Sequence, residues 1–316
     1  MVHVFHFFSS LFSNGSSEAN SINTLFLRYM ILAGFIILLV TGLVIIGAFR
    51  YNAKKKSKEP KQVFGNKKLE MVWTILPLLA VTFFFFLTVQ TMSEINRPHP
   101  SNESPDIVIV AHQWWWDMKY PKYNVETANE LHIPVNKKLL AQIESADVIH
   151  DWWVPALGRK IDAVPGRKNY TWIDASKPGD YEGTCSEYCG MQHAWMRIKV
   201  IAESQNDFNK WIKSQQQIPS IANESNALKG EKFFLSNTCA DCHAISGTPA
   251  DANVGPNLTH FASRQTMLSG MMKNNDHNLK RWLTDPQKVK PGARMPNFIL
   301  TKAEVNELAE YLEELK

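Results

Sequence analysis

Residues 29–49 read YMILAGFIILLVTGLVIIGAF, and residues 71–92 read MVWTILPLLAVTFFFFLTVQTM. Neither stretch contains a charged side chain, and each is long enough to cross a hydrocarbon core about 30 Å thick. Uncharged runs of this length favour membrane spans over the core helix of a soluble protein or a signal peptide. Pro77 does not alter this prediction, since proline more often kinks a membrane helix than ends it. The two stretches therefore predict a membrane-spanning helical hairpin.

The segment that joins the two stretches is strongly basic. Residues 50–68 carry eight lysines and arginines, and Glu59 is their one acidic residue, in a chain of formal net charge +4. This local run accounts for the basic pI and gives no reason to expect a nucleic acid partner. The positive-inside rule places the basic loop in the cytoplasm, with both termini and everything after residue 96 on the outer side of a bacterial plasma membrane. The apolar stretch at residues 1–8 lacks a basic flank, so cleavage of a signal sequence stays open.

The rest of the chain divides into an all-β and an all-α region. The length of 316 residues and the hydrophobic content of 45% indicate several folded domains and exclude general disorder. Short alternating runs broken by turns predict a β-sandwich, and a Thr301–Glu304 capping box predicts a terminal helix. The predicted segments are an N-terminal extramembrane segment (1–24), the hairpin (25–93, basic loop 50–68), the sandwich (94–203), a helix and linker (204–224) and a helical domain (225–316).

One pair of cysteines lies in the sequence CADCH, formed by Cys239, Cys242 and His243. This C-x-x-C-H pattern is typical of covalent c-type haem attachment, where two thioethers hold the porphyrin and the histidine binds iron. A zinc site or a thioredoxin-like motif is the alternative, but the sequence offers neither a second ligand pair nor a βαβ context. The pattern predicts a covalently bound haem c.

The second axial ligand of that haem must come from elsewhere in the domain. The candidate thioethers are Met267, Met271, Met272 and Met295. Met295 lies in the Pro/Gly loop KPGARMPNF, whose rigid backbone can present a thioether, whereas the other three suit a helix core. We therefore expect Met295 to be the ligand.

The other pair of cysteines lies in CSEYCGMQHAWM, which contains Cys185, Cys189, His193 and Met196, and His150 precedes it at a strand end. In an exported domain a structural disulfide is the simplest alternative, but it would not require the neighbouring imidazoles and thioether. Two thiolates could bridge two coppers, although spacing alone leaves open a single zinc bound by two cysteines and two histidines. The additional methionine favours copper.

Several stretches resemble known families. DVIHDWWVPALGRKIDAVPGR followed by CSEYCGMQHAWM resembles subunit II of the haem–copper cytochrome c oxidases, as do LEMVWTILP and AHQWWWDMKYP. Residues 226–316, with CADCH, GPNL, RWLTDP and MP, resemble a class I cytochrome c. The resemblance implies a multidomain membrane protein with a two-helix transmembrane hairpin, an all-β cupredoxin-like sandwich and an all-α cytochrome c domain.

The resemblance also implies roles for individual residues. It implies a binuclear CuA site in which Cys185 and Cys189 bridge the coppers, His150 and His193 each bind one, Met196 is a weak axial ligand, and Glu187 contributes its backbone carbonyl. The side chain of Glu187 would also offer a ligand to a magnesium ion at the boundary with subunit I, with Asp162 nearby. A solvated acidic loop is the alternative for these two carboxylates.

Two further residues have a role only through the resemblance. Trp114 stands on a predicted strand with Trp115 and Trp116, where ordinary packing is the simplest expectation. The family pattern implies instead that electrons enter CuA through Trp114. Glu70, at the cytoplasmic end of the second span, is most simply an interfacial carboxylate, whereas the family pattern places it at the mouth of a proton pathway.

The resulting prediction is an electron-transfer subunit of a proton-pumping respiratory oxidase. Electrons would pass from a cytochrome c or another haem donor through haem c and CuA to the haem of subunit I, where dioxygen is reduced. The expected partners are membrane lipid, subunit I and subunit III. A nitric oxide reductase with a CuA subunit is one alternative, and a membrane-tethered copper carrier, which would not need C-x-x-C-H or a second span, is another.

Overall fold

The structure is a computed structural model that describes residues 15–51, 64–96, 104–221 and 226–316. The described residues form two compact units. One unit contains the long helices from Asn20 onward, and the other contains residues 15–19 together with everything after residue 103. Residues 1–14 and much of the basic loop, including Lys54, Lys55, Lys56, Lys58 and Lys61, lie outside the described residues.

The first unit is a pair of long apolar helices, α2 (Ser17–Arg50) and α3 (Lys67–Ile95). At about 1.5 Å per residue, each helix is longer than the roughly 30 Å hydrocarbon core of a membrane. Most of their large apolar side chains are exposed in the isolated chain, as expected for helices surrounded by lipid. The predicted two-helix hairpin is confirmed, and α2 begins at Ser17.

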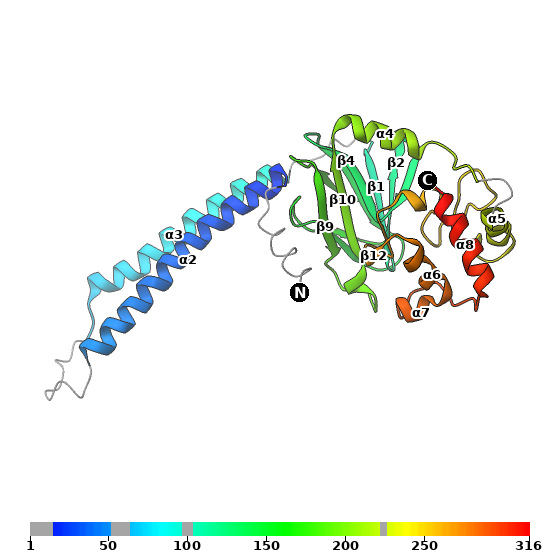
Figure 1. The fold of residues 1–316 in the computed structure, drawn as a ribbon. Helices are drawn as coiled ribbons and strands as arrows, with labels where there is room; N and C mark the ends of the chain where they lie inside the picture. Colours follow the sequence, from blue (N-terminus) through cyan, green and yellow to red (C-terminus); the bar gives the residue numbers. More distant parts are fainter. Residues whose placement is uncertain (1–14, 52–63, 97–103, 222–225) are drawn as a thin grey trace. The chain divides into compact units, whose positions relative to one another are not determined.

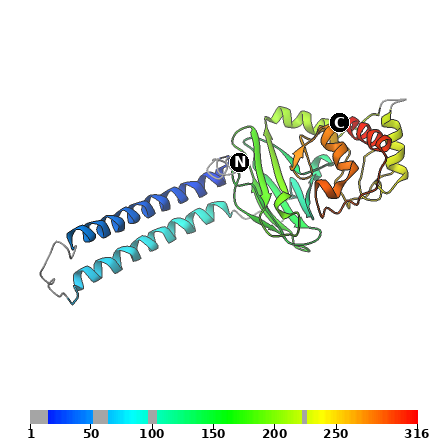
Figure 2. The same ribbon diagram turned by 60° about the horizontal axis from the view of Figure 1, so that its bottom comes forward.

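The two helices run side by side in both views of the structure (Figures 1 and 2). Tyr29 of α2 stacks on Phe84 of α3 with a centroid distance of 4.2 Å, and its hydroxyl lies 3.0 Å from Thr88 Oγ1. Helix α3 continues through Pro77, as the sequence predicts. Its first turn is capped by Asn66, whose side chain accepts hydrogen bonds from the backbone N–H groups of Lys68 and Leu69.

The second unit begins with a β-sandwich of two five-stranded sheets (Figure 1). One sheet has the order β3-β2-β1-β5-β8 and the other β4-β10-β9-β6-β7. The first sheet contains β1 (Ile107–His112), β2 (Trp115–Tyr120), β3 (Val125–Ala128), β5 (Leu139–Ser145) and β8 (Asn169–Ile173). The second contains β4 (Glu130–Pro134), β6 (His150–Trp153), β7 (Ile161–Ala163), β9 (Gly179–Cys185) and β10 (Arg197–Glu203).

Alternation along the strands fills the space between the sheets. In β1, Ile107, Ile109 and Ala111 are buried and their neighbours are only partly buried. Trp116 of β2 is fully buried and meets Trp152 of β6 edge to face at 5.3 Å, so that these two rings join the sheets. The predicted all-β sandwich is confirmed.

The C-terminal part of the same unit is mostly helical. Helix α4 (Gln205–Gln215) leads from the sandwich to α5 (Asn226–Ser236), α6 (Asp276–Thr284), α7 (Pro286–Val289) and α8 (Lys302–Glu314), with short strands β11 (Thr266–Met267) and β12 (Met272–Lys273) between. The predicted capping box of Thr301 and Glu304 is present at the start of α8. A Cβ added to Gly230 of α5 would lie 2.0 Å from the carbonyl oxygen of Glu307, so glycine lets α5 and α8 cross closely.

Candidate copper and haem sites

The predicted copper ligands meet at one end of the second sheet. His150 is the first residue of β6 and Cys185 the last residue of β9, and antiparallel pairing of these strands brings the two together. The loop after Cys185 returns through the short helix η3 (His193–Trp195), and the N–H of Cys185 donates to the carbonyl of Met196 at 2.9 Å. Strand register and one short loop therefore assemble the whole cluster.

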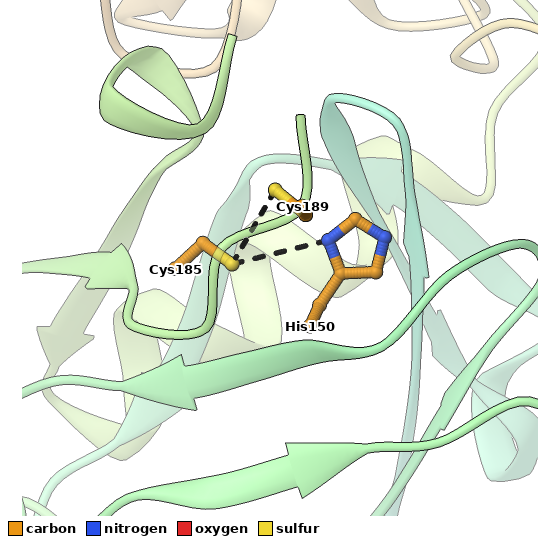
Figure 3. A group of neighbouring side chains, drawn as sticks. All are labelled: His150, Cys185 and Cys189. Carbon is orange, nitrogen blue, oxygen red and sulfur yellow. Dashed lines mark hydrogen bonds between the residues drawn. The ribbon is translucent and has the colours of Figure 1, made fainter. Parts of the chain in front are cut away.

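Figure 3 shows the sulfur of Cys185 between the sulfur of Cys189 and the imidazole of His150. The two Sγ atoms are 3.8 Å apart, too far for a disulfide, and both cysteines are free. Cys185 Sγ lies 3.9 Å from His150 Nδ1 and 3.2 Å from the backbone oxygen of Glu187. Cys189 Sγ lies 3.6 Å from His193 Nδ1 and 3.9 Å from Met196 Sδ.

Burial and ligand type favour a soft metal at this cluster. His150, Cys185, Cys189 and Met196 are buried, and the atoms of His150, Cys185 and Cys189 lie within 4.8 Å of one another. A hydrogen bond with Cys189 lowers the pKa of Cys185 to about 4, and the same interaction raises the pKa of Cys189. The thiol pair thus readily carries one negative charge, and thiolates with a thioether and imidazoles are ligands that suit copper.

Asp147 is a residue of this site that the sequence reasoning missed. Its Oδ1 lies 2.8 Å from His150 Nε2, and its Oδ2 accepts the N–H of Gln113 at 2.6 Å. Although burial opposes ionisation, hydrogen bonds from His150 and from the N–H groups of Gln113 and Val148 lower the pKa of Asp147 to about 2. An ionised Asp147 fixes the ring of His150 with Nδ1 toward the sulfurs. The signal in the sequence was an aspartate three residues before the histidine, which is too common to be specific.

Trp114 lies beside the copper cluster but not on a strand. Antiparallel pairing of His112 with Trp115 leaves Gln113 and Trp114 in the turn between β1 and β2, so the expectation that Trp114 stands on the strand was wrong. From this turn, the indole Nε1 donates to the carbonyl of Cys189 at 3.0 Å, and Gln113 Nε2 donates to the same oxygen at 2.7 Å. The turn therefore holds the peptide of a predicted copper ligand.

The predicted haem ligands line one cavity, whose wall comes mainly from the helical domain and also includes Gln113, Trp114, Trp115 and Asn129 of the sandwich. Cys239, Cys242, His243 and Met295 all contribute to its wall. Of the other methionines considered, Met267 also lines the cavity, whereas Met271 and Met272 do not contribute to its wall. Apolar side chains complete the lining, among them Phe234, Leu279, Leu283, Leu308 and Leu312.

The surroundings of His243 suit an axial ligand. Its Nδ1 lies 2.7 Å from the carbonyl oxygen of Pro256, which fixes the ring and leaves Nε2 available. A Cβ added to Gly255 would lie 2.5 Å from His243 Cε1, so glycine is required beside the imidazole.

The cavity also has a polar part of its wall, which suits the carboxylates of a haem. Arg264 lines it, and its Nε is buried without a hydrogen-bond partner among the described residues. Arg264 Nη2 donates to the carbonyl of Asn257, so the guanidinium is only partly satisfied. An apolar cavity with such a cation in its wall suits a flat apolar macrocycle that carries carboxylates. The residues present therefore fit a covalent haem.

Three other residues with predicted roles are Glu70, Glu187 and Asp162. Glu70 is exposed in the first turn of α3, where its Oε1 accepts the N–H of Asn66 at 3.3 Å. The side chain of Glu187 is exposed. Asp162 of β7 pairs in register with Asp151 of β6, and burial raises the pKa of Asp151 to about 6.

Comparison with known proteins gives three family matches. Residues 8–90 match the cytochrome c oxidase subunit II transmembrane domain, residues 124–203 match its periplasmic domain, and residues 227–316 match cytochrome c. These matches coincide with the hairpin, most of the sandwich and the helical domain. They imply copper in the sandwich and haem c in the helical domain.

Similar proteins match over most of the chain. Cytochrome c oxidase subunit 2 of Alkalihalophilus pseudofirmus is 34% identical over 89% of this chain and 84% of its own length. The same subunit of Bacillus sp. (strain PS3) is 33% identical over 85% and 80%. The crystal structure of the periplasmic domain of subunit II of cytochrome oxidase from Bradyrhizobium japonicum is 36% identical, covers 36% of this chain and 96% of that chain, and superposes with a TM-score of 0.35. The chain therefore belongs to the cytochrome c oxidase subunit II family and carries a cytochrome c domain at its C-terminal end.

Proposed function

We propose that this protein is the electron-accepting subunit of a respiratory, proton-pumping cytochrome c oxidase. It would receive electrons from a small haem protein and deliver them to the haem of subunit I, where dioxygen is reduced. When bound, the haem and copper supply reversible one-electron chemistry. The observation that carries the proposal is the arrangement around Cys185 and Cys189, because each sulfur has its own histidine and its own additional donor.

This two-sided arrangement supports a binuclear CuA centre rather than a single zinc. His150 and the Glu187 carbonyl lie on the Cys185 side, and His193 and Met196 lie on the Cys189 side. A tetrahedral zinc site would need only the two cysteines and two histidines. The extra thioether and carbonyl would supply further ligands to a second metal beside the two cysteines.

The protein surroundings would keep these groups dry and fixed. The ligands sit at the end of the sandwich core, and Asp147 and the Trp114 turn orient His150 and the Cys189 peptide. Fixed ligands and excluded water reduce the structural change that accompanies each electron transfer. Cys239 and Cys242 would hold the haem covalently, and His243 and Met295 would bind its iron.

The other predictions extend this proposal to the membrane and the partner subunits. The hairpin would place the basic loop in the cytoplasm and both redox domains outside, facing the electron donor. Glu70 would lie at the mouth of a proton pathway, and Glu187 would offer a magnesium ligand at the subunit I boundary. Trp114 would be the residue through which electrons reach the copper.

The decisive experiment is metal analysis with EPR and optical spectroscopy of the purified full-length protein. We expect two coppers per chain, an odd electron whose hyperfine splitting is shared by two equivalent copper nuclei, and haem that survives denaturation. A single-copper spectrum, bound zinc or extractable haem would contradict the proposal. Reduction by small haem proteins, and identification of the copurified catalytic subunit, then separate an oxygen reductase from a nitric oxide reductase.

A further inference from the structure

Lys290 is a buried cation in the wall of the haem cavity. It lies at the start of the KPGARMPNF loop, is only 5% exposed, and lines the cavity together with Arg264 and Met295. Its Nζ makes one hydrogen bond, to the carbonyl of Trp114 at 3.3 Å. In the part of the chain that the structure describes, this ammonium forms no salt bridge.

An unpaired buried ammonium indicates a missing anion. Desolvation lowers the pKa of Lys290 to about 8. Burying a cation without a counter-charge costs several kcal/mol, which a paired carboxylate offsets. The haem that this cavity would hold carries two carboxylates, and the cavity wall provides two cations, the buried Lys290 and the partly buried Arg264.

The partner of Lys290 within the protein belongs to the other domain. The Trp114 carbonyl accepts both Lys290 Nζ and the Ser269 hydroxyl, the latter at 2.7 Å. The same Trp114 donates its indole N–H to the carbonyl of Cys189. Trp114 therefore connects Lys290 to the peptide of Cys189, a predicted copper ligand.

The residues that follow Lys290 make further contacts with the sandwich near the copper ligands. Pro291 accepts a hydrogen bond from Gln192, and Arg294 donates to the side chain of Gln113. A Cβ added to Gly292 would lie 2.9 Å from Met191 Cε, so the loop lies directly against the segment that follows Cys189. The loop that presents Met295 is thus also the loop that meets the copper-binding turn.

From this geometry we propose that Lys290 binds a carboxylate of the haem and the main chain of Trp114 at the same time, so that filling the cavity holds the cytochrome domain against the copper site. This inference rests on the proposed haem and copper sites. It makes Lys290 a positioning residue that couples haem binding to docking of the two domains.

The test compares three variants of the purified full-length protein with haem and copper bound. Lys290→Met removes the cation, Lys290→Arg keeps it, and Lys288→Met removes an exposed lysine from the neighbouring helix α7. Two properties are measured besides electron transfer. One is the midpoint potential of the haem, and the other is hydrogen exchange at the N–H of Arg197, which donates to Ser269 across the domain interface at 3.2 Å.

Lys290→Met should lower the midpoint potential, because a cation beside the haem disfavours its oxidised form. It should also speed exchange at Arg197 and slow electron transfer between the domains, each by about tenfold, the effect of losing one charge-assisted hydrogen bond. Lys290→Arg and Lys288→Met should behave like the unaltered protein. Incomplete covalent attachment of haem in Lys290→Met but not in Lys290→Arg would also support the proposal.

Two results would overturn it. One is a Lys290→Met protein whose potential and exchange match those of Lys288→Met, and the other is equal damage by Lys290→Met and Lys290→Arg. Failure of the unaltered protein to show covalent haem or copper would instead refute the proposed function, so the two failures are distinguishable.

Discussion

The carboxylate of Glu130, in strand β4 of the sandwich, accepts two hydrogen bonds from Thr266 of the cytochrome domain. The backbone N–H of Thr266 lies 2.7 Å and its hydroxyl 2.5 Å from Glu130 Oε1, and the N–H of Gln265 lies 3.0 Å from Oε2. Glu130 is only 1% exposed. A buried carboxylate that is satisfied by three donors from another domain fixes how the two domains dock.

Glu130→Gln should therefore loosen the domain interface without unfolding either domain. The amide keeps the shape but loses the charge, and its NH₂ group cannot accept from these donors. We expect a loss of about 2 kcal/mol, or about thirtyfold faster hydrogen exchange at the Gln265 and Thr266 N–H groups. Glu182→Gln, an exposed change on β9, is the control. Unchanged exchange at both N–H groups in Glu130→Gln would show that the contact does not hold the domains.

Asp147→Asn should weaken copper binding while the ligands themselves stay intact. The asparagine no longer presents a carboxylate to His150 Nε2, so the ring loses the partner that directs Nδ1 toward the sulfurs. Loss of such a supporting partner typically costs about 10- to 100-fold in metal affinity. Competition with a copper chelator measures the loss, and the exposed Asp251→Asn is the control. Equal affinities of the two variants would contradict the orienting role of Asp147.

The sequence was sufficient to predict the membrane helices, the sandwich and the ligand clusters whose residues are close together in the chain. Uncharged runs of more than 20 residues predict the hairpin because the core helices of soluble proteins do not need apolar stretches of that length. C-x-x-x-C and C-x-x-C-H are local patterns, so their residues lie close together in any fold. His150 could also be placed, since it begins a strand that the resemblance aligns with the cysteines. Its approach to Cys185 then follows from strand pairing.

The contacts between the domains could not be predicted in this way. Glu130 and Thr266, or Trp114 and Lys290, are more than a hundred residues apart, and each looks like an ordinary polar or turn residue in the sequence. Trp114 was misplaced because the run QWWW is equally compatible with a continuous strand. Only the register of β1 and β2, with His112 opposite Trp115, turns the chain at Gln113 and Trp114.

Asp117 predicts how the stability of the sandwich depends on pH. Desolvation, assisted by the charge of Glu126 and opposed by Lys119 at 3.1 Å, raises the pKa of Asp117 to about 7. Because the folded protein then binds a proton that the unfolded chain has lost, stability should fall as the pH rises from about 4 to about 7. The slope contributed by this group should be at most about 1.4 kcal/mol per pH unit.

Urea unfolding of the full-length protein across this pH range measures the slope. Asp117→Asn should flatten it, whereas the exposed Glu182→Gln should leave it unchanged. A slope that persists in Asp117→Asn would assign the pH dependence to another group.

Trp114→Phe tests whether electrons reach the copper through the turn between β1 and β2. Phenylalanine keeps an aromatic ring against Gly190, where the indole now packs, but removes the N–H that bonds to the Cys189 carbonyl. The main-chain contacts of residue 114 with Ser269 and Lys290 do not depend on its side chain, so the domains should stay docked. We expect electron transfer between the domains to slow by about tenfold, the effect of one lost hydrogen bond of about 1.4 kcal/mol, with little change in the copper EPR spectrum.

The control is Trp211→Phe, in α4 against Tyr120, which removes an indole away from the metal site and should leave the rate unchanged. Equal rates in the two variants would mean that electrons reach the copper by a route that bypasses Trp114.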